Sequence, residues 1–475
     1  MLLEGQGYMF RQIALINLNV ALISIVPSNE LWVSVKFKES PLKYLCIGQP
    51  VELASDVYGR NVLYDKKIVG FPTTHLFPTV RQKFYVIIYS LALHNIFNGW
   101  FKTMSTTHPK IVIVGGSLAG LTLALACAVR GISVVIVERS SQRKHGGDSL
   151  TIDPDALAAT VGYDPRNQPI LSVVPAYRPL TTWSALYSWL YAHAVNTSNI
   201  IIEENKNVNS VENFGEQAKI IFSDGTVSIV DAVIGADGYQ SIVRRAIAPD
   251  EPFATYAGYL VWRGLVDEQK LKRPVSWPSN GGLWIDLVKG YRLVAAVLPG
   301  ENGSIDIGQR QITFAWFDVN QKTLLRETNC LTEDGYIVKT LAKGMIDKDV
   351  RNKLVKLVPQ LWPEIWEEAV RVGLLSDNVV SGAPICEYKP KRLAYGALAI
   401  IGDAAHVISP MTGRGFATGV DDAMLLANML AHRQENEPIS SIFSEYNALR
   451  LPFIQALVTH SKHLSANYVN YADSN

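Results

Sequence analysis

The chain has 475 residues, 48% of them hydrophobic, and a formal net charge of +1 at pH 7. This length fits two or three domains, and the near-neutral charge without a Lys/Arg-rich block argues against a nucleic-acid partner. The four cysteines form neither a CxxC pair nor a disulfide framework, which argues against a structural zinc site and fits a reducing, cytoplasmic compartment. We therefore expect no bound metal.

Residues 1–103 carry no motif. Apolar runs at 13–26 and 84–97 are broken by Asn and His, and neither reaches the roughly 18 to 20 apolar residues that span a bilayer. The first run is compatible with a signal-peptide core or a membrane contact, although no A-x-A cleavage pattern follows it. The alternative is a poorly packed extension or a start codon placed too early, because Met104 directly precedes the first organised unit. We treat 1–103 as an extension of unknown role and expect function to reside in 104–475.

A βαβ unit opens that part. The run 110–115 (KIVIVG) predicts a strand, GGSLAG a glycine turn, 121–130 a helix and 133–137 a second strand. Gly115 permits the tight turn, and Gly120 lets the helix approach the strand. Ser117 and Leu118 are candidate cofactor-binding residues in this turn, and the helix start that follows offers free N–H groups and the positive end of the helix dipole to a pyrophosphate.

Glu138 ends the second strand, eighteen residues after Gly120, with Arg139 directly following. A carboxylate at this point accepts the hydroxyls of an adenosine ribose, which favours a dinucleotide without a 2′-phosphate. Ser117 replaces the usual middle glycine of G-x-G-x-x-G. The alternative for the loop is a glycine turn in some other α/β protein.

The second motif is the β run beginning at Val233, followed by Asp237 and Gly238. Ser241 and Arg244 come three residues apart on the next helical turn, so the loop presents a carboxylate and a cation. The alternative is an ordinary Asp-Gly turn with a solvated arginine.

The third motif spans residues 399–423. Gly402 and Asp403 directly follow a predicted β-strand, and Asp403 is placed to bind a polyol hydroxyl. A loop carries Pro410. Gly413 and Gly415 then open a long apolar helix whose first amides point at an electron-rich ring.

Three further residues of this motif carry charge or a titratable ring. His406 is either a satisfied structural histidine, which we favour, or a catalytic base. Asp421 and Asp422 fall inside the helix, where we expect them to pair locally and to matter less than Asp403.

In this order and spacing, the three motifs resemble those of the group A flavoprotein monooxygenases, the aromatic-ring hydroxylases similar to 4-hydroxybenzoate hydroxylase, over about residues 104–450. The resemblance implies that the glycine loop and acidic residue bind the ADP half of FAD. It also implies that the Asp-Gly motif serves FAD and NAD(P)H and that the Gly-Asp motif holds the ribityl chain. Carried over, these roles fall on Gly115, Gly120, Glu138, Asp237, Gly238 and Asp403.

Three segments are also similar to the branch containing 2,6-dihydroxypyridine 3-hydroxylase. They are GGS in the glycine loop, TTWSALYSWL at 181–190 and YLVWRG at 259–264. Trp183 stands where many group A enzymes carry an FAD-binding arginine, so this chain departs from the family there.

Between the second and third motifs, strand-like runs lie at 259–266, 283–288, 292–298 and 312–317, with a hairpin turn at Lys289-Gly290. They predict an inserted antiparallel sheet that covers the flavin. Their aromatic residues, Trp262, Trp284, Phe314 and Trp316, either give the pocket a flat apolar surface or belong to the core, the alternative that we favour. Arg263 either points into the cavity and pairs with an anionic or phenolic substrate oxygen, or points outward as a surface charge.

We therefore expect an α/β fold: a Rossmann-like FAD-binding domain (104–255 and 380–430), an inserted, mainly antiparallel β-sheet substrate domain (256–379) and a C-terminal helical segment (431–475). The resemblance implies an oxidoreductase in which NAD(P)H reduces FAD and a C4a-hydroperoxyflavin transfers one atom of O2 to a small electron-rich aromatic or N-heteroaromatic ring. Such chemistry needs no protein nucleophile. Candidate catalytic residues are Arg263, His406 and Pro410, whose loop would face the reactive edge.

Two other classes stay open. One is an FAD-dependent reductase or halogenase of the same fold, although no WxWxIP segment of the halogenase kind is present. The other is a non-catalytic flavin-binding protein, or a membrane-associated one, for which residues 1–103 give the hint. A homodimer is compatible with the sequence.

Overall fold

The computed structural model describes residues 110–141, 149–165, 170–174, 179–278 and 280–474, together with five strands before residue 110. The chain divides into two compact units, Met1–Ser105 and Thr106–Asn475. No helix among the described residues is long and apolar enough to cross a membrane.

The first unit holds one antiparallel sheet with the strand order β1-β2-β5-β4-β3. Its strands are β1 (Leu22–Val26), β2 (Trp32–Phe37), β3 (Pro50–Ala54), β4 (Leu63–Gly70) and β5 (Phe84–Tyr89). The remainder of the two apolar runs at 13–26 and 84–97 lies outside the described residues.

The second unit contains a six-stranded sheet with the order β10-β7-β6-β14-β21-β20. The first five strands are parallel, and β20 is an antiparallel edge. The bounds are β6 (Ile111–Val114), β7 (Val134–Val137), β10 (Ile200–Glu203), β14 (Ala232–Gly235), β20 (Ala394–Tyr395) and β21 (Leu398–Ile400). The apolar β6, β14 and β21 are buried at every position, as parallel strands covered on both faces require.

The chain winds outward from β6 through β7 to β10 and then returns to the other side of β6 with β14 and β21. The winding direction therefore reverses between β6 and β14. Ligands of open α/β sheets bind at such a switch point, beyond the carboxyl ends of the strands.

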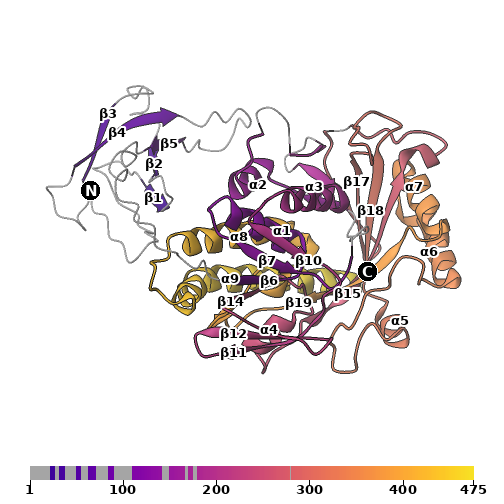
Figure 1. The fold of residues 1–475 in the computed structure, drawn as a ribbon. Helices are drawn as coiled ribbons and strands as arrows, with labels where there is room; N and C mark the ends of the chain where they lie inside the picture. Colours follow the sequence, from indigo (N-terminus) through magenta and orange to yellow (C-terminus); the bar gives the residue numbers. More distant parts are fainter. Residues whose placement is uncertain are drawn as a thin grey trace. The chain divides into compact units, whose positions relative to one another are not determined.

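Helices α1, α3 and α8 lie on one side of this sheet, and the small sheet of β11 to β13 lies on the other (Figure 1). Ser117 and Thr182 cap α1 and α3 with side-chain oxygens. The bounds are α1 (Leu118–Ala128), β8 (Ser149–Thr151), α2 (Pro154–Val161), β9 (Leu180–Thr182), α3 (Trp183–Val195), β11 (Val208–Phe214), β12 (Gln217–Phe222), β13 (Val227–Val230), α4 (Ile242–Ile247) and α8 (Gly415–Ala431).

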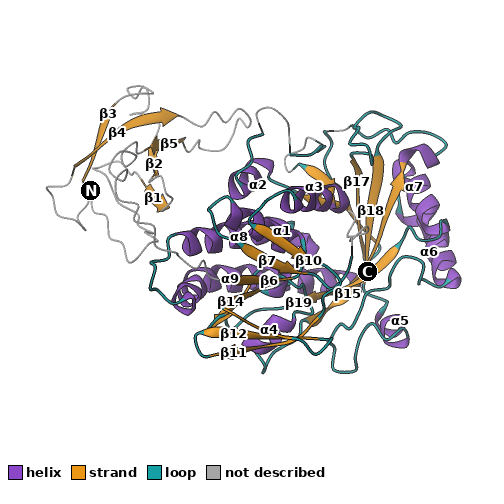
Figure 2. Ribbon diagram, viewed as in Figure 1, coloured by secondary structure: helices purple, strands orange, loops and turns teal. Residues whose placement is uncertain are grey.

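The inserted sheet is antiparallel, with the order β16-β17-β18-β15-β19 (Figure 2). Lys289 and Gly290 form the expected hairpin turn, both with positive φ (47° and 82°), as a two-residue type I′ turn requires. β19 adds a fifth strand after residue 379, where we expected the substrate domain to end. The bounds are β15 (Thr255–Asp267), β16 (Trp284–Val288), β17 (Tyr291–Leu298), β18 (Gln311–Asp318), α5 (Lys322–Glu327), α6 (Lys348–Leu361), α7 (Glu364–Leu375) and β19 (Ser381–Glu387).

The two faces of the inserted sheet have different partners. On one face Trp262, Phe314 and Trp316 are buried in a core shared with α6 and α7, so these aromatic residues are core residues, as expected. Because side chains alternate along a strand, Tyr259, Val261 and Arg263 belong to the opposite face.

The C-terminal helix α9 (Ile439–Asp473) joins both sheets. Near its start the Tyr446 hydroxyl donates to the Ile400 carbonyl of β21 over 3.3 Å, and near its end the Tyr468 hydroxyl donates to the Phe317 carbonyl of β18 over 2.7 Å. The expected α/β fold with an inserted antiparallel sheet and a C-terminal helical segment is thus confirmed.

Candidate functional site

The three sequence motifs meet at one edge of the parallel sheet. They follow the adjacent strands β6, β14 and β21. The residues that come directly after β7, the next strand of the sheet, lie at the same edge. The Ser117 hydroxyl donates to the Ala236 carbonyl over 2.8 Å and so joins the first motif to the second. The sheet order alone therefore assembles a composite site from segments almost 300 residues apart.

The glycine loop is packed too tightly for other residues. A Cβ added to Gly120 would lie 2.1 Å from the Gly115 carbonyl oxygen, and one added to Gly115 (φ +106°) would lie 2.6 Å from the Ala236 oxygen. Ser117 Oγ also accepts from the Gly120 amide over 3.2 Å, which gives the serine a capping function in this loop. The Leu118 amide precedes the helical hydrogen bonds and is free to meet an anionic group.

Glu138 is buried behind this loop. Its Oε2 accepts from the Gly116 amide over 2.8 Å, and its Oε1 accepts from the Ser140 amide and hydroxyl over 3.1 and 2.7 Å. The carboxylate thus fixes the glycine loop as well as standing where a ribose is expected, while Arg139 is exposed. Trp183 stacks on Tyr187, with ring centroids 4.9 Å apart.

The second motif has a buried polar atom without a protein partner. Asp237 Oδ2 accepts from the Ile242 amide over 2.7 Å, but Oδ1 is buried and has no hydrogen bond to any described residue. Burial raises the pKa of Asp237, and hydrogen bonds from Ser241 and Ile242 offset only part of this effect. Gly238 follows with φ +81° and has open space where a Cβ would lie. An unsatisfied buried oxygen beside open space suits a ligand hydroxyl.

Arg244 is neither the solvated charge nor the presented cation that the sequence suggested. It is fully buried and donates to the carbonyls of Pro252 and Ala404, over 3.0 and 3.2 Å, and to that of Tyr239. Since the Ala404 carbonyl belongs to the third motif, Arg244 fastens the second and third motifs to each other.

Asp403 lies in a short turn after β21, directly after Gly402 (φ +56°). Its side chain is exposed and accepts no hydrogen bond from the described residues. Partial desolvation by the neighbouring protein raises the pKa of this carboxyl group, an effect partly offset by the charges of His406 and Arg244. Asp403 therefore stands ready to accept hydrogen bonds from a ligand.

Asp422 is a residue of this site that the sequence did not reveal. It is fully buried, and its Oδ2 accepts from the Gly402 amide over 3.0 Å and pairs with His406 Nε2 at 2.7 Å. Its Oδ1 accepts from Arg450 Nε of α9 over 2.7 Å. The expectation of local pairing is wrong for Asp422, because Arg450 lies on another helix. The feature of the sequence that could have identified Asp422 is a carboxylate within a buried, apolar helix.

His406 is completely buried in this ion cluster, behind the turn that carries Asp403. This position favours the structural alternative over a catalytic base in contact with substrate. Asp421, by contrast, is 40% exposed and lies 3.5 and 3.7 Å from Arg450 and Arg414.

The loop after His406 carries an exposed Pro410 and leads into α8. Gly413 ends a short turn with φ +59°, and α8 begins at Gly415, so Gly413 precedes the helix and does not open it as expected. A Cβ added to Gly415 would meet no atom within 4 Å. The start of α8 therefore has open space beside the Gly415 Cα.

Arg263 is surrounded by small residues on its sheet face. Its strand neighbours in register are Ala315 on β18 and Ser381 on β19. The charges of Arg139 and Arg263 both act on Tyr239 of the second motif, where they oppose the rise in pKa that burial causes. Arg263 lies on the same face of β15 as Tyr259, whose hydroxyl lies 2.7 Å from that of Ser409 in the third motif, so this face of the sheet meets the nucleotide motifs.

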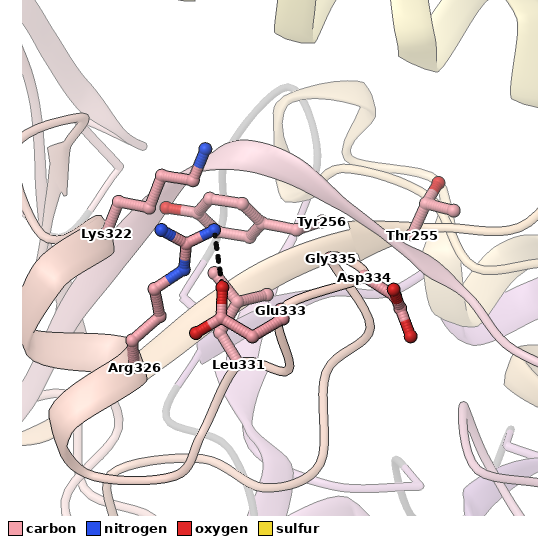
Figure 3. A pocket seen from close by; sticks show the side chains of 8 residues that line it. All are labelled: Thr255, Tyr256, Lys322, Arg326, Leu331, Glu333, Asp334 and Gly335. Carbon is pink, nitrogen blue, oxygen red and sulfur yellow. Dashed lines mark ion pairs between the residues drawn. The ribbon is translucent and has the colours of Figure 1, made fainter.

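A pocket of about 350 Å³ lies apart from these motifs (Figure 3). Its cationic side, Lys322 and Arg326 of α5, is partly neutralised by an Arg326–Glu333 pair at 3.5 Å. The full lining is Thr255, Tyr256, Lys322, Arg326, Leu331, Glu333, Asp334 and Gly335. None of the predicted site residues lines it.

These observations fit FAD. Free amides at the start of α1 suit its pyrophosphate, and unbonded oxygens on Asp237 and Asp403 suit its hydroxyls. The open space at Gly238 and Gly415 allows a ligand to approach the backbone closely.

Comparisons with known proteins agree with this geometry. A model of the FAD binding domain family matches residues 368–461, and a model of FAD binding domain-like proteins matches residues 256–371. The chain is 26% identical to 2,6-dihydroxypyridine 3-monooxygenase of Paenarthrobacter nicotinovorans, over 70% of this chain and 85% of that protein. It is 25% identical to salicylate hydroxylase of Pseudomonas putida, over 72% and 82% of the two chains.

Solved structures share the fold. The structure of 2,6-dihydroxypyridine-3-hydroxylase from Arthrobacter nicotinovorans superposes with a TM-score of 0.61 at 22% identity, covering 77% of this chain and 93% of that one. Klebsiella pneumoniae HpxO complexed with FAD and uric acid gives a TM-score of 0.56 at 19% identity, covering 78% and 94%. The chain thus carries a match to the FAD binding domain family and resembles FAD-dependent aromatic monooxygenases in sequence and in fold.

Proposed function

We propose that this protein hydroxylates a small, electron-rich aromatic or N-heteroaromatic compound with FAD, NAD(P)H and O2. The observation that carries the proposal is the meeting of three FAD-compatible motifs at the switch point of the parallel sheet, beside the face of the inserted sheet that carries Tyr259 and Arg263. The relatives named above, which act on dihydroxypyridine and salicylate, support this substrate class.

In this proposal the chain's own residues bind and orient. The first amides of α1 hold the pyrophosphate, and Glu138 accepts from the adenosine ribose. Asp403 binds the ribityl chain, and Asp237 lies at the junction of the motifs. When bound, the flavin is reduced by NAD(P)H and activates O2, chemistry that no side chain supplies. The amides around Gly415 stabilise negative charge on the ring.

Arg263 is our candidate for substrate recognition. On the sheet it lies between the small neighbours Ala315 and Ser381, and its guanidinium suits a phenolate or carboxylate oxygen. The carbon to be hydroxylated would thereby be held in one orientation, and a fixed geometry is the main contribution that the protein makes to the transfer.

The test is a panel of hydroxypyridines, phenols and hydroxybenzoates, scored by stimulated NAD(P)H oxidation and by a product one oxygen heavier. We expect a subset to satisfy both criteria, and Arg263→Ala to raise KM for its anionic members while FAD content stays the same. A protein that oxidises NAD(P)H without incorporating oxygen into any compound would be a reductase. A colourless protein that takes up no FAD would contradict the proposal altogether.

A further inference from the structure

A buried hydroxyl network holds the start of the loop that leads to α8. Ser409, directly before Pro410, is fully buried, and its hydroxyl lies 2.7 Å from that of Tyr259 on β15. Its amide donates to Ser461 Oγ of α9 over 2.8 Å, and its own Oγ accepts from the Met411 amide over 3.1 Å. The loop thus starts from a residue held by the inserted sheet and by α9.

Glu387 is at the centre of this network. Its side chain on β19 is buried, and its Oε1 accepts from the hydroxyls of both Ser461 and Ser465, in the latter case over 3.1 Å. Ser465 Oγ also lies 3.3 Å from the Tyr259 hydroxyl. Each serine has a single proton, and once it is donated to the carboxylate the oxygen can only accept. The carboxylate therefore orients Ser461 to accept from the Ser409 amide.

Burial raises the pKa of Glu387. The hydroxyls of Ser461 and Ser465, the charge of Lys462 and the Ser409 amide offset only part of this effect, so burying the carboxylate has a desolvation cost. The network holds Ser409 in one position through contacts with β15 and β19 of the inserted sheet and with α9.

We propose that Glu387 is a positioning residue. Acting through Ser461, Ser465 and Tyr259, it fixes Ser409 and with it the loop 410–415 at a set distance from the substrate-side sheet. The inference rests on the proposed function, in which this loop faces the flavin ring. The network would therefore fix the sheet that carries Arg263 and the loop that meets the flavin in position relative to each other.

The variants Tyr259→Phe, Glu387→Ala and Glu387→Gln test the network, with Tyr468→Phe as the matched control. Tyr468 is also buried on α9 and packs edge-on against Tyr259, with centroids 5.2 Å apart. Its hydroxyl, however, bonds to the Phe317 carbonyl and has no hydrogen bond to Ser409. Tyr468→Phe thus removes a hydroxyl from the same aromatic cluster and leaves the hydrogen bonds around Glu387 intact.

The first measurement is amide hydrogen exchange of the loop 409–415 in the full chain. We expect exchange to become roughly 5- to 10-fold faster in Tyr259→Phe and Glu387→Ala, as loss of one buried hydrogen bond produces. Glu387→Gln, which keeps an acceptor oxygen, should largely restore the rate, and Tyr468→Phe should leave it unchanged. Unchanged exchange in Tyr259→Phe would overturn the proposal, and this variant also decides the matter if Glu387→Ala fails to fold.

The second measurement is the visible absorption spectrum of bound FAD, which reports the surroundings of the ring. We expect it to shift in Tyr259→Phe and Glu387→Ala, but not in Tyr468→Phe. Faster loop exchange with an unchanged flavin spectrum would reject the role at the flavin. If the unmodified protein takes up no FAD, the proposed function fails, while the exchange experiment still decides whether Glu387 positions the loop.

Discussion

The amide of Gly402 donates a 3.0 Å hydrogen bond to the carboxylate of Asp422, which lies 20 residues further along the chain. The exposed Asp403 is therefore held from behind by a buried aspartate of α8, which is itself paired with His406 and Arg450. Two acidic residues of one motif thus have different tasks, one facing the ligand and one supporting the turn.

Asp403→Ala should lose bound flavin, whereas Asp421→Ala should keep it. Asp403 is the carboxylate without a protein partner at the sheet edge, while Asp421 is an exposed member of an ion pair with Arg450. FAD per chain after desalting is the measurement. The reverse result would mean that the ribityl chain is bound elsewhere.

Asp422→Asn should be strongly destabilising. Removing one charge of a buried ion pair leaves the other uncompensated, at a cost of about 3 to 5 kcal/mol. Asp421→Asn, at a half-exposed position, should change the free energy of unfolding by about 0 to 1 kcal/mol. Urea unfolding of both variants gives the comparison, and equal midpoints would show that the cluster around Asp422 contributes little.

Asp422 should also make stability depend on pH in acid. Burial alone would raise the pKa of Asp422, but His406 and Arg450 outweigh it and hold the pKa below the ordinary aspartate value of 3.8. Because the unfolded carboxylate takes up a proton more readily, its stabilising effect is complete above about pH 5 and is lost as pH falls through the lower folded pKa. The difference in unfolding free energy between the native protein and Asp422→Asn should therefore shrink below about pH 4.

Two glycine-to-alanine substitutions should have opposite outcomes. Gly120→Ala places a methyl group 2.1 Å from a backbone oxygen, so the loop and α1 must separate and the protein should be unstable. Gly415→Ala meets no protein atom, and alanine is favoured in a helix by up to about 1 kcal/mol, so stability should be kept. Reduced FAD affinity in a fully stable Gly415→Ala would then locate the cofactor itself at this position. Unchanged affinity would place it elsewhere.

Glu138→Ala should weaken FAD binding by roughly 10- to 150-fold, which corresponds to loss of a charged hydrogen bond of about 1.5 to 3 kcal/mol. Part of this loss comes from the protein, because the Gly116 amide loses its acceptor. Glu203→Ala is the control, since Glu203 ends the neighbouring strand β10 and its carboxylate pairs with Lys206 at 2.6 Å. Equal affinities in the two variants would remove Glu138 from the nucleotide site.

The sequence predicted the structure correctly wherever residues close together in the chain determine it. Strand, glycine turn and helix follow one another over residues 110–128, and the Lys289-Gly290 turn fixes its hairpin by two positive φ angles. Asp422, Arg244 and Glu387 could not be assigned in this way, because their partners lie on elements that only the folded chain brings together. The fifth strand, β19, was missed because its pairing with β15 spans more than a hundred residues.

The long helix α9 has a consequence for how the protein is made. Its first half completes the nucleotide-binding side through Tyr446, and its second half completes the inserted sheet through Tyr468. Neither domain has all of its contacts until the 35 residues of α9 have left the ribosome, although domains commonly fold from the N-terminus during synthesis. Nascent chains of this protein should therefore remain sensitive to protease until α9 has been synthesised and has left the ribosome.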